Sequence, residues 1–258
     1  MKNTGPGFED FVQYATSSVT PPRDVYRCGT GPPVIVLHEL LGAGPTLFRF
    51  AHRIADAGFQ VYVPILFGRA NHEGTLLSSF PQVVRVCLSK EFAAFSLGRS
   101  SPITDWVRQL GHEIVLRSEH ESLGIVGLCL TGNFALTLAC EDWVAASVVS
   151  EPSLPFGITA ASKSDLHLSN EEIVRVERRV REGFVVLAFR FRDDWISPPE
   201  RDIALRAHFA PGVGGNGSLA PTCPNAHAVF TDHFDETAGT STAAALRELL
   251  DYLKVRLF

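Results

Sequence analysis

Short β-branched runs alternate with longer amphipathic stretches along this chain of 258 residues, and this alternation constrains the fold more than any other feature. Apolar runs of about four to eight residues are typical of buried strands, whereas apolar residues about three or four apart indicate helices. We therefore expect strands over residues 33–38, 59–64, 123–128, 144–149 and 184–190. The stretches between and after them predict helices over residues 46–58, 104–119, 131–141, 169–183, 198–209 and 240–257. Strands that alternate with helices favour a mostly parallel sheet with helices on both faces, so the sequence predicts an α/β fold.

The length is sufficient for one large domain with a substantial core. We expect a single domain over residues 1–258. Residues 1–31 are interpreted as an N-terminal extension, and residues 155–183 as a lid or an insertion.

Composition and charge exclude several classes of function. Hydrophobic residues make up 45% of the chain and charged residues 20%, as in a folded globular protein. The net charge is −5 and no basic run occurs, which argues against a nucleic-acid partner or an anionic membrane surface. The first residues lack the apolar core of a secretory signal, and no uncharged apolar run reaches the length of about 18 residues that indicates a membrane span.

The cysteines give a further constraint. Five occur, at positions 28, 87, 129, 140 and 223, and none forms a CxxC pair. This spacing argues against a disulfide framework and against a zinc site, so we expect no metal. Reduced thiols indicate a cytoplasmic protein.

Polar and nucleophilic residues follow the predicted strands at four points. Parallel sheets bind their ligands at the carboxyl ends of the strands, so these residues are candidates for a common site. They are His38 and Glu39 after the first strand, Cys129 after the central strand, Asp193 and Asp194 after the strand at 184–190, and His227 and His233 before the last helix. The order nucleophile, acid, histidine is the one that α/β-hydrolases use.

These residue types suit nucleophilic catalysis. An imidazole can take the proton of Cys129, and the resulting thiolate is a nucleophile that the start of the following helix stabilises. An aspartate on the far side of the imidazole would hold its tautomer and stabilise its cation. The amides of Leu130 and Leu40 are candidates for an oxyanion hole, in which one donor contributes about 3–4 kcal/mol in well-studied enzymes.

Each candidate also has a structural interpretation. Cys129 can be an inert core residue, and Glu39 a solvated loop acid. The Asp193–Asp194 pair can cap the helix that begins near Pro198, and the two histidines can lie on the surface. The functional interpretation is favoured because all four positions occur together and in the expected order.

The sequence resembles the dienelactone hydrolase family, whose members are cysteine-dependent α/β-hydrolases. The resemblance runs from about residue 32 to the C-terminus, and its motifs are "PVIVLHELLGAGPTLFRFAHRIADAGFQVYVPILFGR", "GLCLTG", "DDWISPP" and "AHAVF". It implies an α/β-hydrolase fold with Cys129 as nucleophile, Asp194 as acid and His227 as base. It also implies that Glu39 keeps the thiol quiet until substrate arrives.

The chain departs from the family pattern at several positions. Thr131 stands where the family has glycine, and a β-branched residue there is expected to strain the turn. His233 remains an alternative base to His227. The family archetype binds the substrate carboxylate with an arginine four residues after the catalytic histidine; that position is Thr231 relative to His227, or Thr237 relative to His233. Arg69 or Arg99 can supply a cation instead, or lie on the surface.

The sequence thus predicts a hydrolase of a small-molecule ester or lactone that forms an acyl-enzyme on Cys129 and needs no cofactor. Alternatives are a non-catalytic ligand-binding protein of the same fold, and a thioesterase or acyltransferase. A nucleotide-binding protein is disfavoured because no GxGxxG precedes a helix. We expect a monomer or a homodimer.

Overall fold

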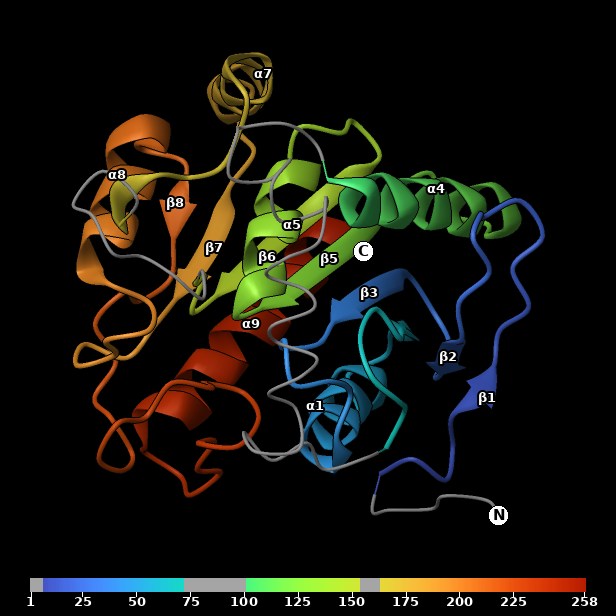
Figure 1. Ribbon diagram of the computed structural model, residues 1–258, viewed down its shortest axis with the longest axis horizontal. Helices are drawn as coiled ribbons and strands as arrows, with labels where there is room; N and C mark the ends of the chain where they lie inside the picture. Colours follow the sequence, from blue (N-terminus) through green and yellow to red (C-terminus); the bar gives the residue numbers. More distant parts are fainter. Residues whose placement is uncertain (1–6, 72–100, 154–162) are drawn as a thin grey trace.

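The computed structural model describes residues 7–71, 101–153 and 163–258. These residues form one eight-stranded sheet in the order β1-β2-β4-β3-β5-β6-β7-β8 (Figure 1). The strands are β1 (Val12–Gln13), β2 (Val25–Cys28), β3 (Pro33–Leu37), β4 (Gln60–Pro64), β5 (Leu123–Leu128), β6 (Val144–Ser150), β7 (Val186–Phe189) and β8 (Val213–Gly214). The pairs β1–β2 and β2–β4 are antiparallel, and all other pairs are parallel. The mostly parallel sheet is therefore confirmed.

Helices cover both faces of the sheet, as Figure 1 shows. Residues of α1 (Pro45–Asp56) and α9 (Ser241–Leu257) pack in one hydrophobic core. Residues of α4 (Pro102–Arg117), α5 (Leu130–Leu138), α7 (Asn170–Arg181) and α8 (Pro199–Phe209) pack in the other. Side chains alternate between the faces of a strand, so each central strand contributes to both cores.

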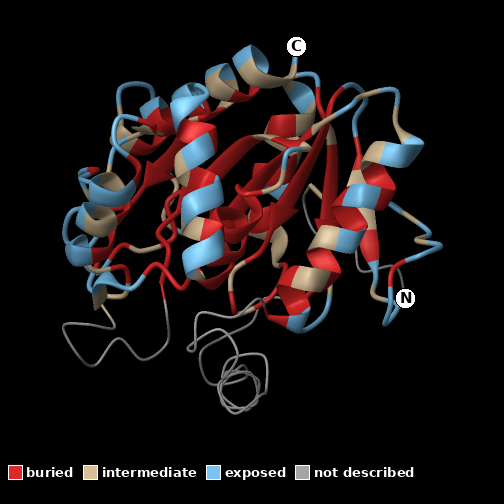
Figure 2. Cartoon of the chain, turned by 90° about the horizontal axis from the view of Figure 1, so that it is seen from above, coloured by how far each residue is buried: buried red, intermediate tan, exposed pale blue. Residues whose placement is uncertain are grey.

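Burial follows this layered arrangement. The central strands β3 and β5 are buried throughout and β6 is buried at every residue but Ala145, whereas the helices expose their outer sides (Figure 2). Strand β5, in the middle of the sheet, has six residues that are all buried. Its last residue, Leu128, directly precedes Cys129, so the candidate nucleophile stands at the carboxyl end of the most protected strand.

The two segments set apart in the sequence analysis contain regular structure. Strands β1 and β2 lie within residues 1–31 and extend the sheet at one edge. Helix α7 lies within residues 155–183 and begins with the capping box that Ser169 and Glu172 form. Residues 154–162 lie outside the described part of the chain.

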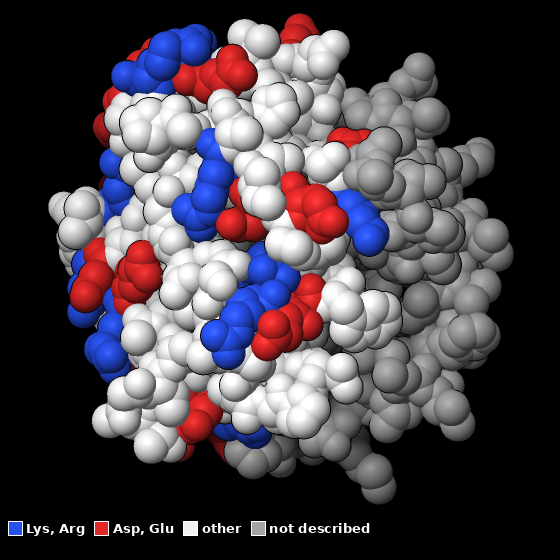
Figure 3. All heavy atoms as spheres, turned by 90° about the vertical axis from the view of Figure 1, so that its left-hand side faces the viewer, with Lys and Arg blue, Asp and Glu red and all other residues white. Residues whose placement is uncertain are grey.

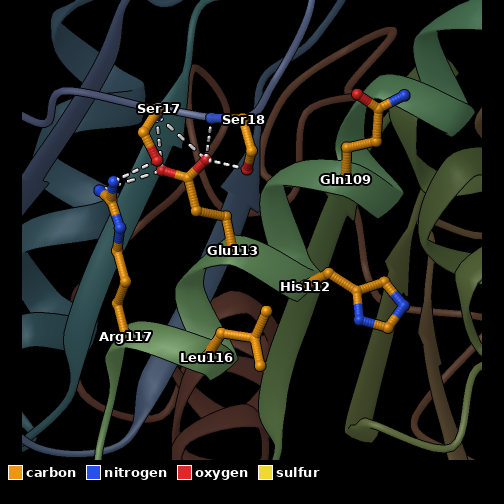
Figure 4. A pocket seen from close by; sticks show the side chains of 7 residues that line it. All are labelled: Ser17, Ser18, Gln109, His112, Glu113, Leu116 and Arg117. Atoms are coloured by element: carbon orange, nitrogen blue, oxygen red, sulfur yellow. Dashed lines mark hydrogen bonds and ion pairs between the residues drawn. The ribbon is translucent and has the colours of Figure 1, made fainter.

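Several side chains of α4 bind the N-terminal segment, among them Arg117, which donates to Ala15 O (2.9 Å), and Trp106, which donates to Pro21 O (2.7 Å). Glu113, which is buried, accepts hydrogen bonds from the backbone amides of Ser17 (2.9 Å) and Ser18 (2.8 Å) and forms an ion pair with Arg117 (3.0 Å). These residues line a surface pocket of about 450 Å³ (Figure 4). The pocket is distant in sequence from every candidate catalytic residue.

The charged surface is mixed. On the face that Figure 3 presents, Lys and Arg alternate with Asp and Glu, and neither sign forms a continuous area among the residues drawn in colour. Of the helices in the described ranges, none has both the length and the apolar character that crossing a membrane requires.

Candidate active site

Cys129 occupies a sharp turn between β5 and α5. Its φ is 55°, in the left-handed region that residues other than glycine seldom adopt, and its ψ is −123°. The turn is held because the Cys129 amide donates to Ser150 O (3.0 Å) and its carbonyl accepts from Gly132 N (3.1 Å). A strained residue at the end of a central strand is the geometry of a nucleophile elbow, which raises a side chain above the sheet.

The residues around Cys129 explain why the chain turns here. Strand β5 and helix α5 approach so closely at Gly127 that a Cβ there would lie 2.2 Å from the carbonyl oxygen of Thr131. The expected strain at Thr131 is not observed, because Thr131 lies in the first turn of α5 and Cys129 takes the positive φ. The buried Thr131 hydroxyl accepts from Leu128 N (3.0 Å) and lies 3.1 Å from the carbonyl oxygen of Leu37.

Asp194 lies in the turn after β7 and is almost completely buried. Its Oδ1 accepts from the amides of Ile196 (2.9 Å) and Ser197 (3.1 Å), which leaves Oδ2 for a side chain. Asp193 is exposed and pairs with Arg192 at 3.4 Å. Of the two aspartates, only Asp194 faces the interior.

His227 is the histidine that contacts this acid. Its Nδ1 lies 2.7 Å from Asp194 Oδ2. Its Nε2 is buried and makes no hydrogen bond to any described residue, and a charge interaction couples the imidazole to Cys129. Because Asp194 occupies Nδ1, the nitrogen left for the thiol is Nε2.

The thiol and the imidazole shift each other's pKa toward an ion pair. Burial acts to raise the pKa of Cys129, but the interaction with His227 and the hydrogen bond from Ser153 outweigh it, so the pKa lies below its ordinary value. Burial acts to lower the pKa of His227, but Cys129 and Asp194 hold that pKa well above its ordinary value. By contrast, burial raises the pKa of Cys28 and of Cys140 to about 12.

Glu39 follows β3 and reaches the same site, but its hydrogen bond goes to Thr231. The Thr231 hydroxyl donates to Glu39 Oε1. Thr231 is the residue at which the family archetype has arginine, so a neutral hydroxyl takes that place in this chain. Burial raises the pKa of Glu39, and its charge acts to raise the pKa of Cys129.

The two other candidate histidines bind the main chain. His38 is fully buried; its Nε2 accepts from Leu66 N (2.9 Å), so Nδ1 carries the proton and donates to Glu39 O (2.7 Å). Burial lowers the pKa of His38 to about 4, which keeps the ring neutral. His233 Nδ1 accepts from the amides of His227 (3.1 Å) and Ala228 (3.0 Å). Both rings therefore brace loops that carry candidate residues.

The remaining candidates have the following positions. Leu130 opens α5, so its amide has no acceptor within the helix. Leu40 is buried in the loop after β3. Arg69 is exposed, and Arg99 lies outside the described residues.

Three buried polar residues at this site were not predicted. Ser153 Oγ lies 3.0 Å from Cys129 Sγ, and Glu151 interacts electrostatically with both Cys129 and His227. Arg190 donates to the carbonyls of Ser197 (2.8 Å) and Asp194 (3.1 Å) and so fixes the acid loop. The available signal for Ser153 and Glu151 was their position just after the predicted strand at 144–149, which is the criterion that identified the other candidates.

Comparisons with known proteins identify the family of this chain. The profile of the dienelactone hydrolase family matches residues 18–168, which is more than half of the chain. The chain belongs to the dienelactone hydrolase family. Its fold is thus the α/β-hydrolase fold, and its activity is that of a hydrolase acting on a small molecule. No curated protein matches the chain in sequence.

Solved structures of low sequence identity share the fold. The protein m3DLH superposes with a TM-score of 0.65 at 16% identity, covering 96% of this chain and 98% of its own. Dienelactone hydrolase from Anabaena variabilis gives 0.59 at 14% identity, covering 97% and 100%. A dienelactone hydrolase-like promiscuous phosphotriesterase from metagenomic libraries gives 0.58 at 15% identity, covering 96% and 98%.

Within the three described ranges, no group of three or more His, Cys, Asp or Glu side chains is arranged to hold a metal ion. Cys28, Cys129, Cys140 and Cys223 are all free thiols, and Cys87 lies outside the described residues.

Proposed function

We propose that this member of the family hydrolyses a carboxylic ester or a lactone through an acyl-enzyme on Cys129. The observation that carries the proposal is the 2.7 Å hydrogen bond between the His227 imidazole and the Asp194 carboxylate, beside a Cys129 thiol that is coupled electrostatically to the same imidazole. The lowered pKa of the thiol and the raised pKa of the imidazole both favour transfer of the thiol proton to His227.

In the proposed acylation, the Cys129 thiolate attacks the carbonyl carbon. The amides of Leu40 and Leu130 are assigned to the oxyanion hole, because they follow the carboxyl ends of β3 and β5, which are neighbouring parallel strands. The C–O bond then breaks, and the leaving alkoxide takes the proton of His227. Asp194 stabilises the imidazolium through Nδ1.

In the proposed deacylation, neutral His227 takes a proton from water as the water attacks the thioester. Collapse of the tetrahedral intermediate breaks the C–S bond and releases the acid. The electron pair returns to sulfur, so the thiolate–imidazolium pair is restored. Glu39 is proposed to modulate the thiol through its charge, since its hydrogen bond is made to Thr231.

The test combines hydrolysis of p-nitrophenyl acetate with iodoacetamide labelling of Cys129 against pH, read by peptide mass. We expect the wild-type thiol to label well below pH 8.5, the approximate pKa of a free cysteine. Cys129→Ala is expected to reduce turnover to background, and His227→Ala to reduce it about 10²–10⁴-fold, because the proton transfers lose their carrier. Cys140→Ala is the matched control, a buried thiol whose pKa is raised.

The variant His233→Asn tests which of the two histidines, His227 or His233, acts as the base. An asparagine oxygen can still accept the amides of His227 and Ala228, so most of the turnover should remain. Full turnover in Cys129→Ala would overturn the proposal. Ready labelling without hydrolysis of any ester would instead favour a binding protein.

A further inference from the structure

Ser153 places a hydroxyl against the proposed nucleophile. It is the third residue after β6, and its side chain is buried, with only 2% of the residue exposed. Its Oγ lies 3.0 Å from Cys129 Sγ, and its amide donates to Cys129 O at 3.3 Å. Two contacts from one residue therefore hold both the side chain and the main chain of Cys129.

A chain of buried polar groups holds Ser153 in this position. Asn133 Nδ2 donates to Ser153 O (2.9 Å) and to Leu130 O (3.0 Å). Asn133 Oδ1 accepts from Arg201 Nη1 at 2.7 Å. Since a guanidinium only donates, this contact fixes which end of the Asn133 amide faces Ser153. Asn133 and Arg201 are both buried, so the arrangement is shielded from competing water.

The direction of the Ser153–Cys129 contact follows from the proton count. When His227 holds the thiol proton, the sulfur can only accept, so the serine hydroxyl donates. We propose that Ser153 is a further catalytic residue of this site, whose hydroxyl donates a hydrogen bond to the Cys129 thiolate. The proposal rests on the function proposed above, because it takes Cys129 as the nucleophile.

The hydrogen bond acts at two steps of the reaction. It stabilises the resting thiolate, and it weakens when the sulfur lone pair forms the C–S bond and negative charge moves to the carbonyl oxygen. In deacylation the C–S bond breaks and its electron pair returns to sulfur. Ser153 then donates again, so it stabilises the thiolate as a leaving group.

The experiment measures the pH profile of Cys129 alkylation by iodoacetamide in the full-length protein. A hydrogen bond to a charged group is strong enough that Ser153→Ala should raise the midpoint by about one pH unit, and slow alkylation below the midpoint about tenfold. Ser147→Ala is the matched control. Ser147 is also a buried serine of the β6 region, but its hydroxyl donates to Ala135 O and does not contact the thiol.

A second pair of variants tests the proposal even if Ser153→Ala fails to fold. Threonine and valine have the same shape and differ by one hydroxyl, so Ser153→Thr should keep the wild-type midpoint and Ser153→Val should raise it. Equal midpoints for these two variants, or for wild type and Ser153→Ala, would overturn the proposal. Alkylation needs no ester, so this readout is independent of turnover. Loss of the proposed function would be seen separately, as hydrolysis that survives Cys129→Ala.

Discussion

Cys129, which is partly buried, differs from the buried cysteines Cys28 and Cys140 above all by its neighbours. Burial raises the pKa of Cys28 and of Cys140, and no cation contacts either thiol closely enough to compensate. At Cys129 the same penalty is outweighed by one imidazole and one hydroxyl, His227 and Ser153. The chemistry of a cysteine in this protein is thus decided by two contacts.

Glu151 is buried, and only one of its two carboxylate oxygens accepts hydrogen bonds from described residues. Its Oε2 accepts from the Ser150 hydroxyl and from Val229 N (3.4 Å), whereas Oε1 has no hydrogen-bond partner among the described residues. Its backbone also has a positive φ of 36°. Burial raises the pKa of Glu151 well above its ordinary value, so the folded protein keeps the carboxyl protonated where the unfolded chain ionises.

This shift predicts a pH-dependent gain in stability from Glu151→Gln. A raised carboxyl pKa in the folded state means that stability is lost as the pH rises above the ordinary value of 4.5, by up to about 1.4 kcal/mol per pH unit until the folded pKa is reached. Glutamine removes this loss, so urea unfolding should show the variant gaining on wild type as the pH rises above the ordinary carboxyl pKa of 4.5. A difference that does not change with pH would contradict the assignment.

At the residue scale, the sequence identified only part of the site. Cys129, Asp194 and His227 could be proposed because each follows a recognisable strand or motif. Ser153 and Glu151 also follow a strand, but serine and glutamate are common loop residues whose contact with sulfur or imidazole depends on the fold. The bond between Thr231 and Glu39 joins residues 192 positions apart, and no local pattern encodes it.

At the scale of secondary-structure elements, the geometry of the elbow between β5 and α5 depends on how closely the strand and the helix pack. Gly127→Ala would place a Cβ against the backbone oxygen of Thr131 at 2.2 Å, and backbone cannot move aside as a side chain can. We expect this variant to lose about 1–3 kcal/mol in the free energy of unfolding, and to lose alkylation of Cys129 at low pH as the turn opens.

Gly124→Ala, in the same strand, is its control. A Cβ there meets the side-chain ends of Leu257 and Leu253 at 3.1 and 3.2 Å, which can shift. Urea unfolding of both variants separates close packing from the general effect of alanine in a strand. Equal losses would show that the approach of Thr131 to Gly127 does not limit the turn.

The central elements were predictable because their signal is local. The strands predicted at 33–38, 59–64, 123–128, 144–149 and 184–190 all occur within a few residues of their expected ends. Strands β1 and β8 have two residues each, so they carry no periodicity to detect. Strand β2 was missed because its partner β4 lies beyond β3 and α1 in the chain, and its pairing was not visible in its own four residues.

At the scale of the whole molecule, Glu113 is one of the α4 side chains that bind the N-terminal segment. Glu113→Gln should weaken this attachment, because a neutral amide oxygen accepts the Ser17 and Ser18 amides less strongly than a carboxylate and cannot pair with Arg117. Hydrogen exchange at these two amides should accelerate about tenfold, while hydrolytic turnover stays unchanged.

Gln109→Ala is the control for this prediction. Gln109 lines the same pocket, but its one hydrogen bond to this segment, from Thr20 N, is long at 3.5 Å. Its removal should leave exchange at Ser17 and Ser18 nearly unchanged. Unaltered exchange in Glu113→Gln would show that contacts other than the carboxylate hold the segment.

The hydroxyl of Thr131 has a consequence for how the ends of β3 and β5 are held together. It bonds to the last residue of β3 and to the last residue of β5, so one oxygen atom links the two strand ends that lead into the Leu40 loop and the Leu130 helix. A glycine at this position would leave these strand ends to the packing of the layers alone. In this chain the hydroxyl adds a local link between them, beside the close packing of β5 on α5.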